Sequence, residues 1–378
     1  MSSKPIPTPA DTFDEWLRLP IASTPEDSPF IVRRARREEF EQIYDVVDAA
    51  FGTKRPRAVY DWLYRKNPTG TARCWIVTER ATGTILKTGA GFPWPIWRGD
   101  EVLLGSVGGD AATRPEWQRK GLSEIRRNIR RTHPWRDDFC SISGPNEGSR
   151  IVMTKSGRDK SLLGRLRGGV ALLRSDHLLA AKGLPRAIAM PIGRAADGLF
   201  EGWRRAALPS PRNATTPSDR IETIDRFTTD YDEVTRRCMA FPDFWCPHNA
   251  EFLNWRYLDH PGESYVALAL LENETPLGYA VVLLDGKKAT LSEFAVAQQP
   301  RLAASRLLRR AMDVAREAGC RHLNFFATPA WRHWPLFYRA GFIPYPSKNQ
   351  FEADHPASEP YVYDQRKWQV MPGDRDYH

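Results

Sequence analysis

The spacing of apolar residues in the first third of the chain predicts a series of short helices and strands. Phe30 to Ala35 predicts a short strand, and Glu38 to Gly52 predicts a helix because its apolar residues recur on one helical face. Gly52 favours a helix end at that point. A second helix is expected over Pro56 to Asn67, because Pro68 disfavours helical backbone in the residue before it. The next apolar runs predict two strand pairs. The first pairs Cys74 to Glu79 with Thr84 to Phe92, and the second lies within Ile96 to Val107.

The second half of the chain repeats parts of this pattern. Tyr60 to Pro68 reads Y-D-W-L-Y-R-K-N-P, and Leu253 to Pro261 reads L-N-W-R-Y-L-D-H-P. The correspondence pairs Trp62 with Trp255, Tyr64 with Tyr257 and Pro68 with Pro261. Apolar runs then predict three strands, a helix, a strand and a last short helix: Tyr265 to Leu271, Gly278 to Leu284, Ala289 to Val296, Ala303 to Ala318, His322 to Ala327 and Leu336 to Phe342. The sequence therefore predicts two halves of similar construction.

This repeat divides the chain into five segments. We expect an N-terminal arm over 1–29, a first domain over 30–165, a connecting segment over 166–220, a second domain over 221–355 and a C-terminal tail over 356–378. The arm is predicted to be mobile, because it carries Pro5, Pro9, Asp11 and Asp14. Whether the tail packs on a domain is left open.

The connecting segment is expected to hold broken helices packed between the domains. Pro185 and Pro191 should prevent one long helix there. A helix lying on a membrane surface is disfavoured over Leu178 to Ile192, because its polar face is poorly segregated. Leu208 to Asp219, rich in Pro, Ser and Thr, is the best candidate for a linker.

One loop carries the clearest chemical signal. Thr113 to Ser123 reads T-R-P-E-W-Q-R-K-G-L-S; it follows a predicted strand, Val102 to Ala112, and precedes a predicted helix, Glu124 to Thr132. The first N–H groups of a helix have no intrahelical acceptor, and the helix dipole favours negative charge there. The turn therefore predicts an anion site, and Gly121 would let the backbone approach a phosphate closely because it has no Cβ.

The loop also has a recognisable spacing. Gln118, Gly121 and Ser123 fit Q/R-x-x-G-x-G/A, with Pro115 three residues before Gln118. This closely resembles the acetyl-CoA pyrophosphate loop of the GNAT superfamily of N-acyltransferases, with Ser123 where Gly or Ala is usual. The resemblance covers about Phe30 to Arg165 and, more weakly, Ile221 to Phe351. It implies an α/β fold of the α+β type: two tandem GNAT-like domains, each a mixed, mostly antiparallel twisted sheet flanked by helices.

The resemblance implies how acetyl-CoA, or another short acyl-CoA, would be held without any metal. Ala111, Ala112 and Thr113 would pair with the pantetheine arm, and the Thr113 N–H is the best candidate to stabilise the oxyanion. The pyrophosphate would be surrounded by Gln118, Arg119, Lys120, Gly121, Leu122 and Ser123. Asn146 and Ser149 match the family's helix-start pattern, where the Asn commonly contacts CoA.

Direct transfer to an amine also needs a group that removes a proton from the amine. Asp110 is the candidate base, because the family often places an acidic residue near this position; it could equally brace the Gly108-Gly109 turn. Glu147 is a weaker candidate. The family's tyrosine acid is expected seven residues after Asn146, where this chain has Met153. The CoA thiolate could then leave unaided, because its pKa is ~8.5.

The second domain is expected to bind no CoA. Aligning Val296 with Thr113 places Ala304 opposite Gly121 and Arg306 opposite Ser123, where a long side chain would crowd a phosphate. This domain would instead wall the acceptor pocket. Its segment Trp331 to Trp334 could stack a sugar or an aromatic acceptor, although most tryptophans are simply core. Further aromatic candidates for the pocket are Phe92, Trp94, Trp97, Trp245 and Trp255.

The composition restricts the classes of ligand and the cellular compartment that we expect for this protein. The net charge of +9 favours anionic ligands, and eight Lys/Arg lie between Arg114 and Arg136 beside the loop. Five scattered cysteines favour a reducing compartment, and the absence of CxxC pairs disfavours structural zinc. No signal peptide and no apolar run of membrane length is seen, so a cytoplasmic protein without a membrane span is expected.

The function that these observations favour is acyl-CoA-dependent N-acyl transfer. An acetyl or short acyl group would move from CoA to a primary amine of a small molecule, with an amino sugar as one candidate. A catalytically silent CoA-binding sensor or scaffold is the alternative; the missing tyrosine favours it and the intact loop disfavours it. The charge would permit nucleic-acid binding, but no motif for it is present. The sequence is compatible with a homodimer.

Overall fold

The structure is a computed structural model of the 378-residue chain. It describes all residues except 1–5, 7, 21–22, 99–100, 133–138, 146, 148–150, 152–153, 155–161, 176–182, 209–218, 239–243, 247, 298–300, 355–358 and 375–378.

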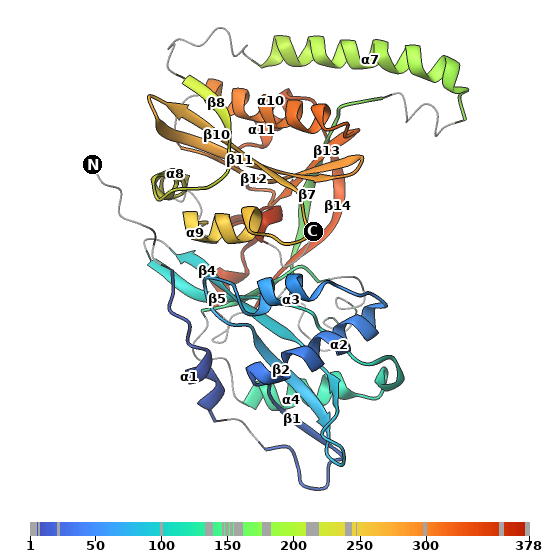
Figure 1. Cartoon of the computed structure of the whole chain (residues 1–378), viewed down its shortest axis with the longest axis vertical. Coiled ribbons are helices and arrows are strands. Elements are labelled where there is room, and N and C mark those ends of the chain that lie inside the picture. Colours follow the sequence, from blue (N-terminus) through green and yellow to red (C-terminus); the bar gives the residue numbers. More distant parts are fainter. Residues whose placement is uncertain are drawn as a thin grey trace.

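The first half follows the predicted order of elements (Figure 1). Its helices are α1 (Phe13–Arg18), α2 (Phe40–Phe51), α3 (Arg57–Tyr64) and α4 (Leu122–Thr132). Its strands are β1 (Phe30–Arg34), β2 (Arg73–Glu79), β3 (Ile85–Lys87), β4 (Ala90–Arg98), β5 (Glu101–Gly109) and β6 (Ser141–Ser143). Gly52 ends α2 in a left-handed conformation with φ 65°, which a residue without Cβ adopts readily.

The second half contains the repeated elements. Its helices are α8 (Asp230–Cys238), α9 (Ala250–Leu253) followed by a π-helical turn (Asn254–Leu258), α10 (Arg301–Glu317) and α11 (Trp334–Arg339). Its strands are β8 (Asp219–Ile224), β9 (Phe244–Trp245), β10 (Tyr265–Glu272), β11 (Thr275–Asp285), β12 (Lys288–Val296), β13 (His322–Ala327), β14 (Phe342–Asp354) and β15 (Trp368–Gln369). Between the halves lie β7 (Leu162–Leu172) and α7 (Arg186–Ala207).

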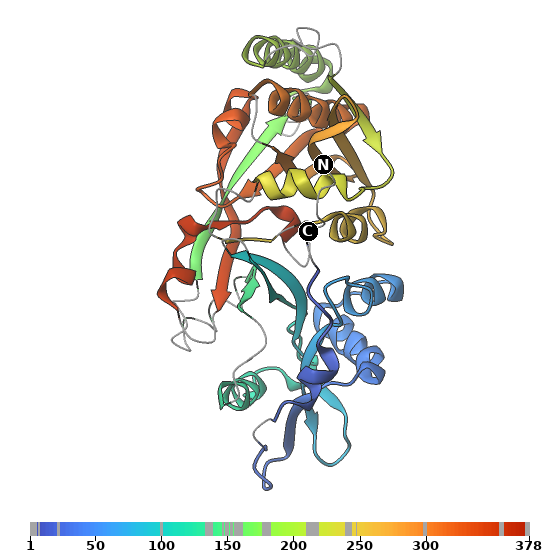
Figure 2. The same ribbon diagram turned by 90° about the vertical axis from the view of Figure 1, so that its left-hand side faces the viewer.

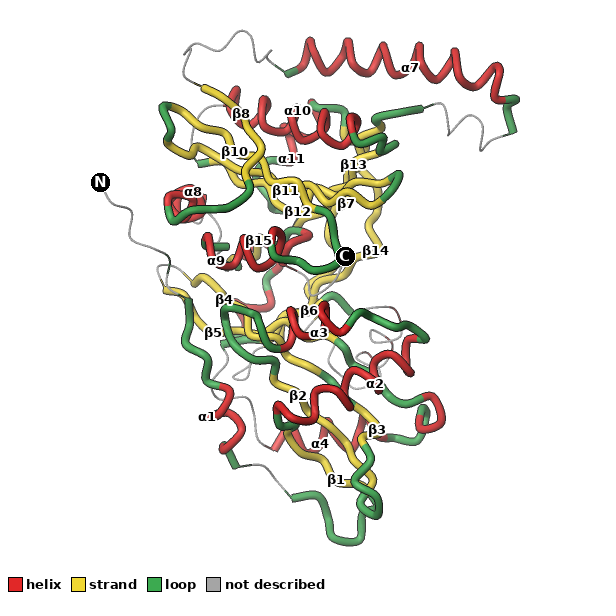
Figure 3. Tube along the Cα trace, viewed as in Figure 1, coloured by secondary structure: helices red, strands yellow, loops and turns green. Residues whose placement is uncertain are grey.

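One sheet runs through both halves (Figure 3). Its order is β1-β2-β4-β5-β6-β14-β7-β13-β12-β11-β10-β8. Along this path only β5 with β6 and β12 with β13 are parallel, one pair in each half. The fold is therefore the expected pair of mixed, mostly antiparallel sheets flanked by helices, and the two sheets are joined edge to edge.

Two strands cross between the halves. β7 pairs with β13 of the second half and with β14, and β14 continues to β6 of the first half. The Ser143 hydroxyl donates to the Glu352 carboxylate at 2.7 Å where β6 and β14 meet. The boundary expected after Arg165 thus falls inside β7.

The expectation of broken helices between the domains is wrong for α7. It is one helix of 22 residues with Pro191 inside it. Pro191 lies only six positions into the helix, so that one backbone hydrogen bond near the N-terminus is lost while the turns after it are intact. Pro185 is the N-cap residue, a position that proline tolerates. The linker expected over Leu208 to Asp219 lies almost wholly outside the described residues.

The described part of the N-terminal arm is packed rather than mobile. Phe13 and Trp16 of α1 are buried, each with 1% exposure. The Ile6 N–H donates to the Asp232 carboxylate at 2.9 Å, which ties the arm to the second half. The C-terminal tail also packs, because β15 pairs with β9 and Trp368 and Met371 are buried.

Candidate functional site

The predicted loop begins where β5 leaves the sheet. Asp110 has a left-handed backbone with φ 45°, which turns the chain away from β4 and towards β3. Ala112 then exchanges two backbone hydrogen bonds with Thr88, and the Arg114 N–H donates to the Leu86 carbonyl. In such an antiparallel pair the intervening Thr113 directs its N–H and C=O away from β3. Of the expected backbone donors, Ala112 is therefore already engaged, whereas Thr113 faces the opposite side.

The turn after Thr113 has the geometry of an anion site. A short 3-10 turn (Pro115–Trp117) leads to Arg119 and Gly121, whose φ angles of 61° and 78° are both left-handed. Successive backbone N–H groups in such a turn form a concave nest for anions. The helix α4 begins at Leu122, so its first N–H groups open onto the same turn. A Cβ added at Gly121 would meet nothing within 4 Å, which shows that this side of the loop is open.

Side chains fix the loop to the first sheet. Trp117 packs edge-on against Phe30 of β1, with ring centroids 5.8 Å apart, and the Lys120 ammonium lies 4.4 Å from the Trp117 ring. The Gln118 amide donates to the Thr113 carbonyl at 3.3 Å. The side chain of Leu122 is buried, whereas Arg119 and Ser123 are exposed.

A buried lysine, which the sequence did not single out, lies behind the loop. Lys87 of β3 is 4% exposed and donates to the Thr113 hydroxyl at 2.9 Å. Burial, and then the nearby charges of Arg126 and Arg127, lower its pKa to about 7. Lys87 therefore fixes the side chain of Thr113, the residue expected to hold the oxyanion. Its sequence position in a three-residue strand gave no sign of this contact.

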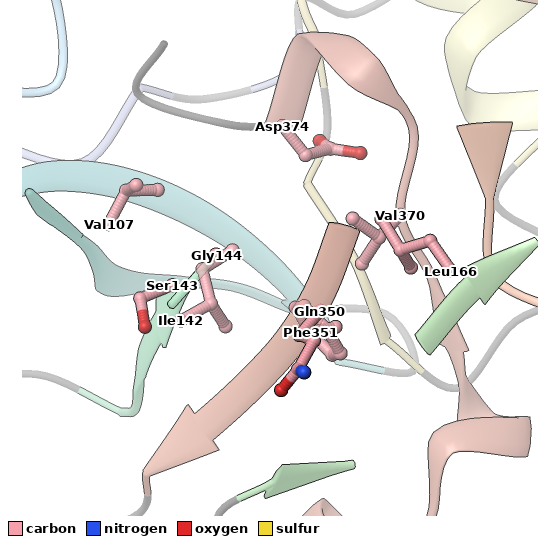
Figure 4. A pocket seen from close by; sticks show the side chains of 9 residues that line it. All are labelled: Val107, Ile142, Ser143, Gly144, Leu166, Gln350, Phe351, Val370 and Asp374. Carbon is pink, nitrogen blue, oxygen red and sulfur yellow. The ribbon is translucent and has the colours of Figure 1, made fainter. Parts of the chain in front are cut away.

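A small pocket opens where β5 and β6 separate. These strands pair only at Ser106 with Ser141 and at Val107 with Ile142. The pocket beyond them, which we call the junction pocket, is shown in Figure 4. It is lined by Val107, Ile142, Ser143, Gly144, Leu166, Gln350, Phe351, Val370 and Asp374. Its walls thus come from the first half, from both crossing strands and from the C-terminal tail.

Asp110 is held by two partners. Its carboxylate accepts from the Arg55 guanidinium at 2.9 and 3.1 Å and from the Tyr64 hydroxyl at 2.8 Å. Its side chain is only 8% exposed, and burial raises the pKa of Tyr64 well above its usual value, so this phenol donates as a neutral group. This geometry favours the bracing role for Asp110; its role as a base stays a prediction.

The second half repeats this arrangement at equivalent positions. Glu293 corresponds to Asp110 and Tyr257 to Tyr64, and the Tyr257 hydroxyl donates to Glu293 at 2.5 Å. His248 replaces arginine as the cation: its Nδ1 lies 2.6 Å from Glu293 and its Nε2 lies 3.0 Å from Asp374. Burial alone would lower the pKa of His248, but the two carboxylates outweigh it and raise the pKa to about 10. Because Glu293 has no exposed surface, this copy of the arrangement is structural.

The corresponding opening in the second half is filled. β12 and β13 pair from Lys288 with His322 to Thr290 with Asn324 and then separate. Beyond that point Phe294 of β12 and Phe325 of β13 both pack on Trp331 and Phe337, with ring centroids 4.5 to 6.2 Å apart. These rings occupy the space between the two strands.

The aromatic candidates are core residues rather than pocket walls. Trp331 and Trp334 are each 2% exposed, so the expectation that they stack an acceptor is wrong. Phe92, Trp94, Trp245 and Trp255 are likewise buried, and Trp97 is partly buried against the core. Arg306 is buried in the second turn of α10. Glu147 is exposed, and Asn146, Ser149 and Met153 lie outside the described residues.

Comparison with known proteins identifies the second half. Residues 229–342 match the family model described as acetyltransferase (GNAT) family. This half of the chain is a GNAT acetyltransferase domain. The match covers α8 to α11, although the open loop and the junction pocket lie in the first half. With the same order of elements in both halves, the protein is a GNAT-type acyltransferase. No curated protein matches the sequence.

Solved structures share the fold of the whole chain. A probable N-acyltransferase of unknown function from Enterococcus faecalis V583 has a TM-score of 0.60 at 11% identity, covering 88% of this chain and 74% of that chain. Saccharomyces cerevisiae N-myristoyltransferase with bound myristoyl-CoA has a TM-score of 0.53 at 11% identity, covering 93% and 87%. At these identities the likeness concerns the fold, and it extends across both GNAT-like halves.

Proposed function

We propose that the protein transfers an acetyl or other short acyl group from CoA to a primary amine of a small molecule. We further propose that the first half holds the acyl-CoA. The observation that carries this assignment is the contrast between the halves: the first has an open glycine turn at the start of α4, whereas in the second aromatic rings fill the space where β12 and β13 separate.

Each part of the loop would have a defined task. The nest around Arg119 and Gly121 and the start of α4 would hold the pyrophosphate, with Lys120 and Arg119 adding positive charge. Ala111 to Thr113 would run beside the pantetheine arm. Asn146 and Ser149 are proposed as further CoA contacts.

Acyl transfer would then proceed by direct attack. The neutral amine nitrogen bonds to the thioester carbon, the C–S bond breaks, and the amine proton leaves to a base or to water while CoA departs as thiolate. The Thr113 N–H is proposed as the donor to the oxyanion, because it points away from β3 and Lys87 fixes its side chain. For Asp110, the ion pair with Arg55 favours positioning the end of β5 over accepting the proton.

The acceptor is proposed to be small because the junction pocket is enclosed by both halves. Four chain segments and the C-terminal tail line it, which leaves little access for a folded protein. An amino sugar is one candidate for this amine. The apolar lining from Val107, Ile142 and Phe351 favours an acceptor, or an acyl group, with an apolar part.

Isothermal titration with acetyl-CoA, free CoA and ATP tests this proposal. One saturable site per chain that prefers acetyl-CoA, followed by thiol release in an amine screen, would support it. Tight CoA binding without turnover on any amine would favour the sensor instead. Two equal sites per chain would contradict the assignment of binding to the first half.

A further inference from the structure

Lys87 connects the buried interior of the first half to the loop. Lys87 and Thr113 face each other as a cross-strand bridge, and the Lys87 ammonium donates to the Thr113 hydroxyl at 2.9 Å. The next pair along, Thr88 with Ala112, exchanges both backbone hydrogen bonds. Lys87 and Thr113 are therefore the adjacent, non-hydrogen-bonded pair, in which cross-strand side chains lie closest. Because Lys87 is buried and Thr113 is partly exposed, the hydroxyl is the exposed end of this contact.

Helix α4 supplies the charges around this contact. Figure 2 shows α4 on one side of the strands of the first half, with α2 and α3 on the other. A Cβ at Gly89 would lie 1.8 Å from Nη1 of Arg126, so the guanidinium occupies space that only a glycine leaves free. Arg126 and Arg127 both act on Lys87, whose cross-strand neighbour on β2 is the apolar Val77. The cations of α4 therefore favour the loss of a proton from Lys87.

The charge on Lys87 decides how the Thr113 hydroxyl is used. An ammonium has donors and no acceptor, so the Thr113 oxygen accepts and its own proton points elsewhere. Burial, and then Arg126 and Arg127, lower the pKa of Lys87 to about 7, below the ~8.5 of a thiol. Proton transfer from Lys87 to a thiolate is therefore favourable, whereas a lysine with the ordinary pKa of 10.5 would keep its proton.

We propose that Lys87 and the Thr113 hydroxyl form a relay that delivers a proton to the sulfur of CoA as the acyl group leaves. The inference rests on the proposed function, in which the Thr113 N–H holds the oxyanion. The sulfur is bonded to the same carbon as that oxygen, so it would lie within reach of the hydroxyl of the same residue. Met153, at the position expected for a tyrosine acid, has no proton to give. Lys87 acts through Thr113 and does not touch the substrate.

The step balances in protons and electrons. As the C–S bond breaks, the sulfur keeps the bonding pair and takes the proton of the Thr113 hydroxyl. The Thr113 oxygen takes a proton from the Lys87 ammonium in turn. CoA is then a thiol and Lys87 a neutral amine. Lys87 regains a proton from the solvent, which receives the proton that the acceptor amine loses.

The pH dependence of binding tests the relay without an acceptor amine. Titration calorimetry of the full chain gives the dissociation constants of CoA and acetyl-CoA from about pH 6 to about pH 9. Acetyl-CoA has no free thiol, so the ratio of the two constants reports on the sulfur. Between pH 7 and ~8.5 the free enzyme and free CoA together hold the one proton that the relay shares. Below pH 7 they hold two, so binding releases one, and the preference for CoA should fall by about threefold or more per pH unit.

Variants distinguish the relay from a structural role of Lys87. In Lys87→Met and in Thr113→Val the fall below pH 7 should disappear, because the shared proton has lost one of its sites. Thr113→Ser keeps the hydroxyl and should keep the fall. The matched control is Thr88→Val, because the buried Thr88 hydroxyl meets no partner among the described residues. It should bind both ligands like the wild type.

Two results would overturn the relay while the proposed function stands. The first is a ratio of the two constants that is the same at every pH in the wild type. The second is a Thr113→Ser variant that behaves like Thr113→Val. If neither CoA nor acetyl-CoA binds at any pH, the proposed function is wrong and the relay with it.

Discussion

Trp62 and Trp255 exchange hydrogen bonds. Each indole N–H donates to the backbone carbonyl of the other residue, at 2.7 and 3.1 Å, and the rings stack with centroids 4.7 Å apart. The two residues occupy equivalent positions in the internal repeat. A reciprocal contact between equivalent residues is the signature of an approximate two-fold axis, so the halves face each other as two subunits of a symmetric dimer would.

Breaking this exchange should destabilise the contact between the halves. Trp62→Phe keeps an aromatic ring but leaves the buried Trp255 carbonyl without its donor, at a cost of about 1–3 kcal/mol. Trp75→Phe is the control, because that buried indole N–H meets no acceptor among the described residues. Urea unfolding measures both. Equal losses in the two variants would show that ring size, not the hydrogen bond, sets the effect.

Gly121→Arg should abolish acyl-CoA binding. The side chain would enter the open side of the loop, and the left-handed backbone, φ 78°, adds strain of about 1–2 kcal/mol. Gly319→Arg carries the same strain at φ 80° and also has open space, but it follows α10 in the second half. Titration calorimetry should show binding lost in the first variant and kept in the second. Normal binding by Gly121→Arg would remove the loop from the site.

Asp110→Asn should act mainly on stability. Removing the charge takes the carboxylate from a mostly buried ion pair with Arg55, which costs about 3 kcal/mol. The pH–rate profile of the variant should keep its shape, with a similar loss at every pH. Glu293→Gln is the matched change at the repeat-equivalent position, where no substrate can reach. If Asp110→Asn alone loses the ascending limb at low pH, Asp110 is the base.

Two buried groups should give opposite pH dependence of stability. His248 has its pKa raised from 6.5 to about 10, so its contribution is complete below pH 6.5 and is lost as the pH rises through 10. Lys87 has its pKa lowered from 10.5 to about 7, so the folded state gains stability over the unfolded state as the pH rises from 7 to 10.5. The two effects oppose each other in the wild type.

Variants of His248 and Lys87 should separate the two opposing effects of pH on stability. Between pH 7 and pH 10, Lys87→Met should lose stability more steeply than the wild type, because only the His248 effect is left. His248→Gln should shift the slope in the other direction. Urea unfolding at several pH values measures both slopes, and parallel curves for the two variants would contradict the assigned partners.

The loop was predictable because its signal is local. Pro115, Gln118 and Gly121 lie within seven residues of one another, between a strand and a helix that the apolar pattern also predicts. The equivalence of Trp62 and Trp255 in the internal repeat could also be predicted from the sequence. The contact between the two residues could not. Sequence spacing gives equivalence of position, whereas contact depends on how the halves are docked.

Contacts between residues far apart in the chain could not be predicted from the sequence. Arg55 is 55 residues from Asp110, and Lys87 is 26 residues from Thr113; nothing in their own neighbourhoods marks these contacts. Trp331 and Trp334 looked like a ligand platform because a short aromatic cluster has the same composition in a pocket and in a core. Pro191 led to a wrong prediction for a different reason. A proline inside a helix destabilises it by about 3 kcal/mol, and the contacts of a well-anchored helix can offset this loss.

The crossing of β7 and β14 bears on how the chain is made. β6 of the first half pairs with β5 on one side, and it gains its second neighbour only from residues 352–354 of β14. As the polypeptide leaves the ribosome, one edge of β6 stays unpaired until almost all of the second half has been synthesised. The joining of the two sheets would then come after synthesis of the second half, and until that point the exposed edge of β6 would be open to pairing with other chains.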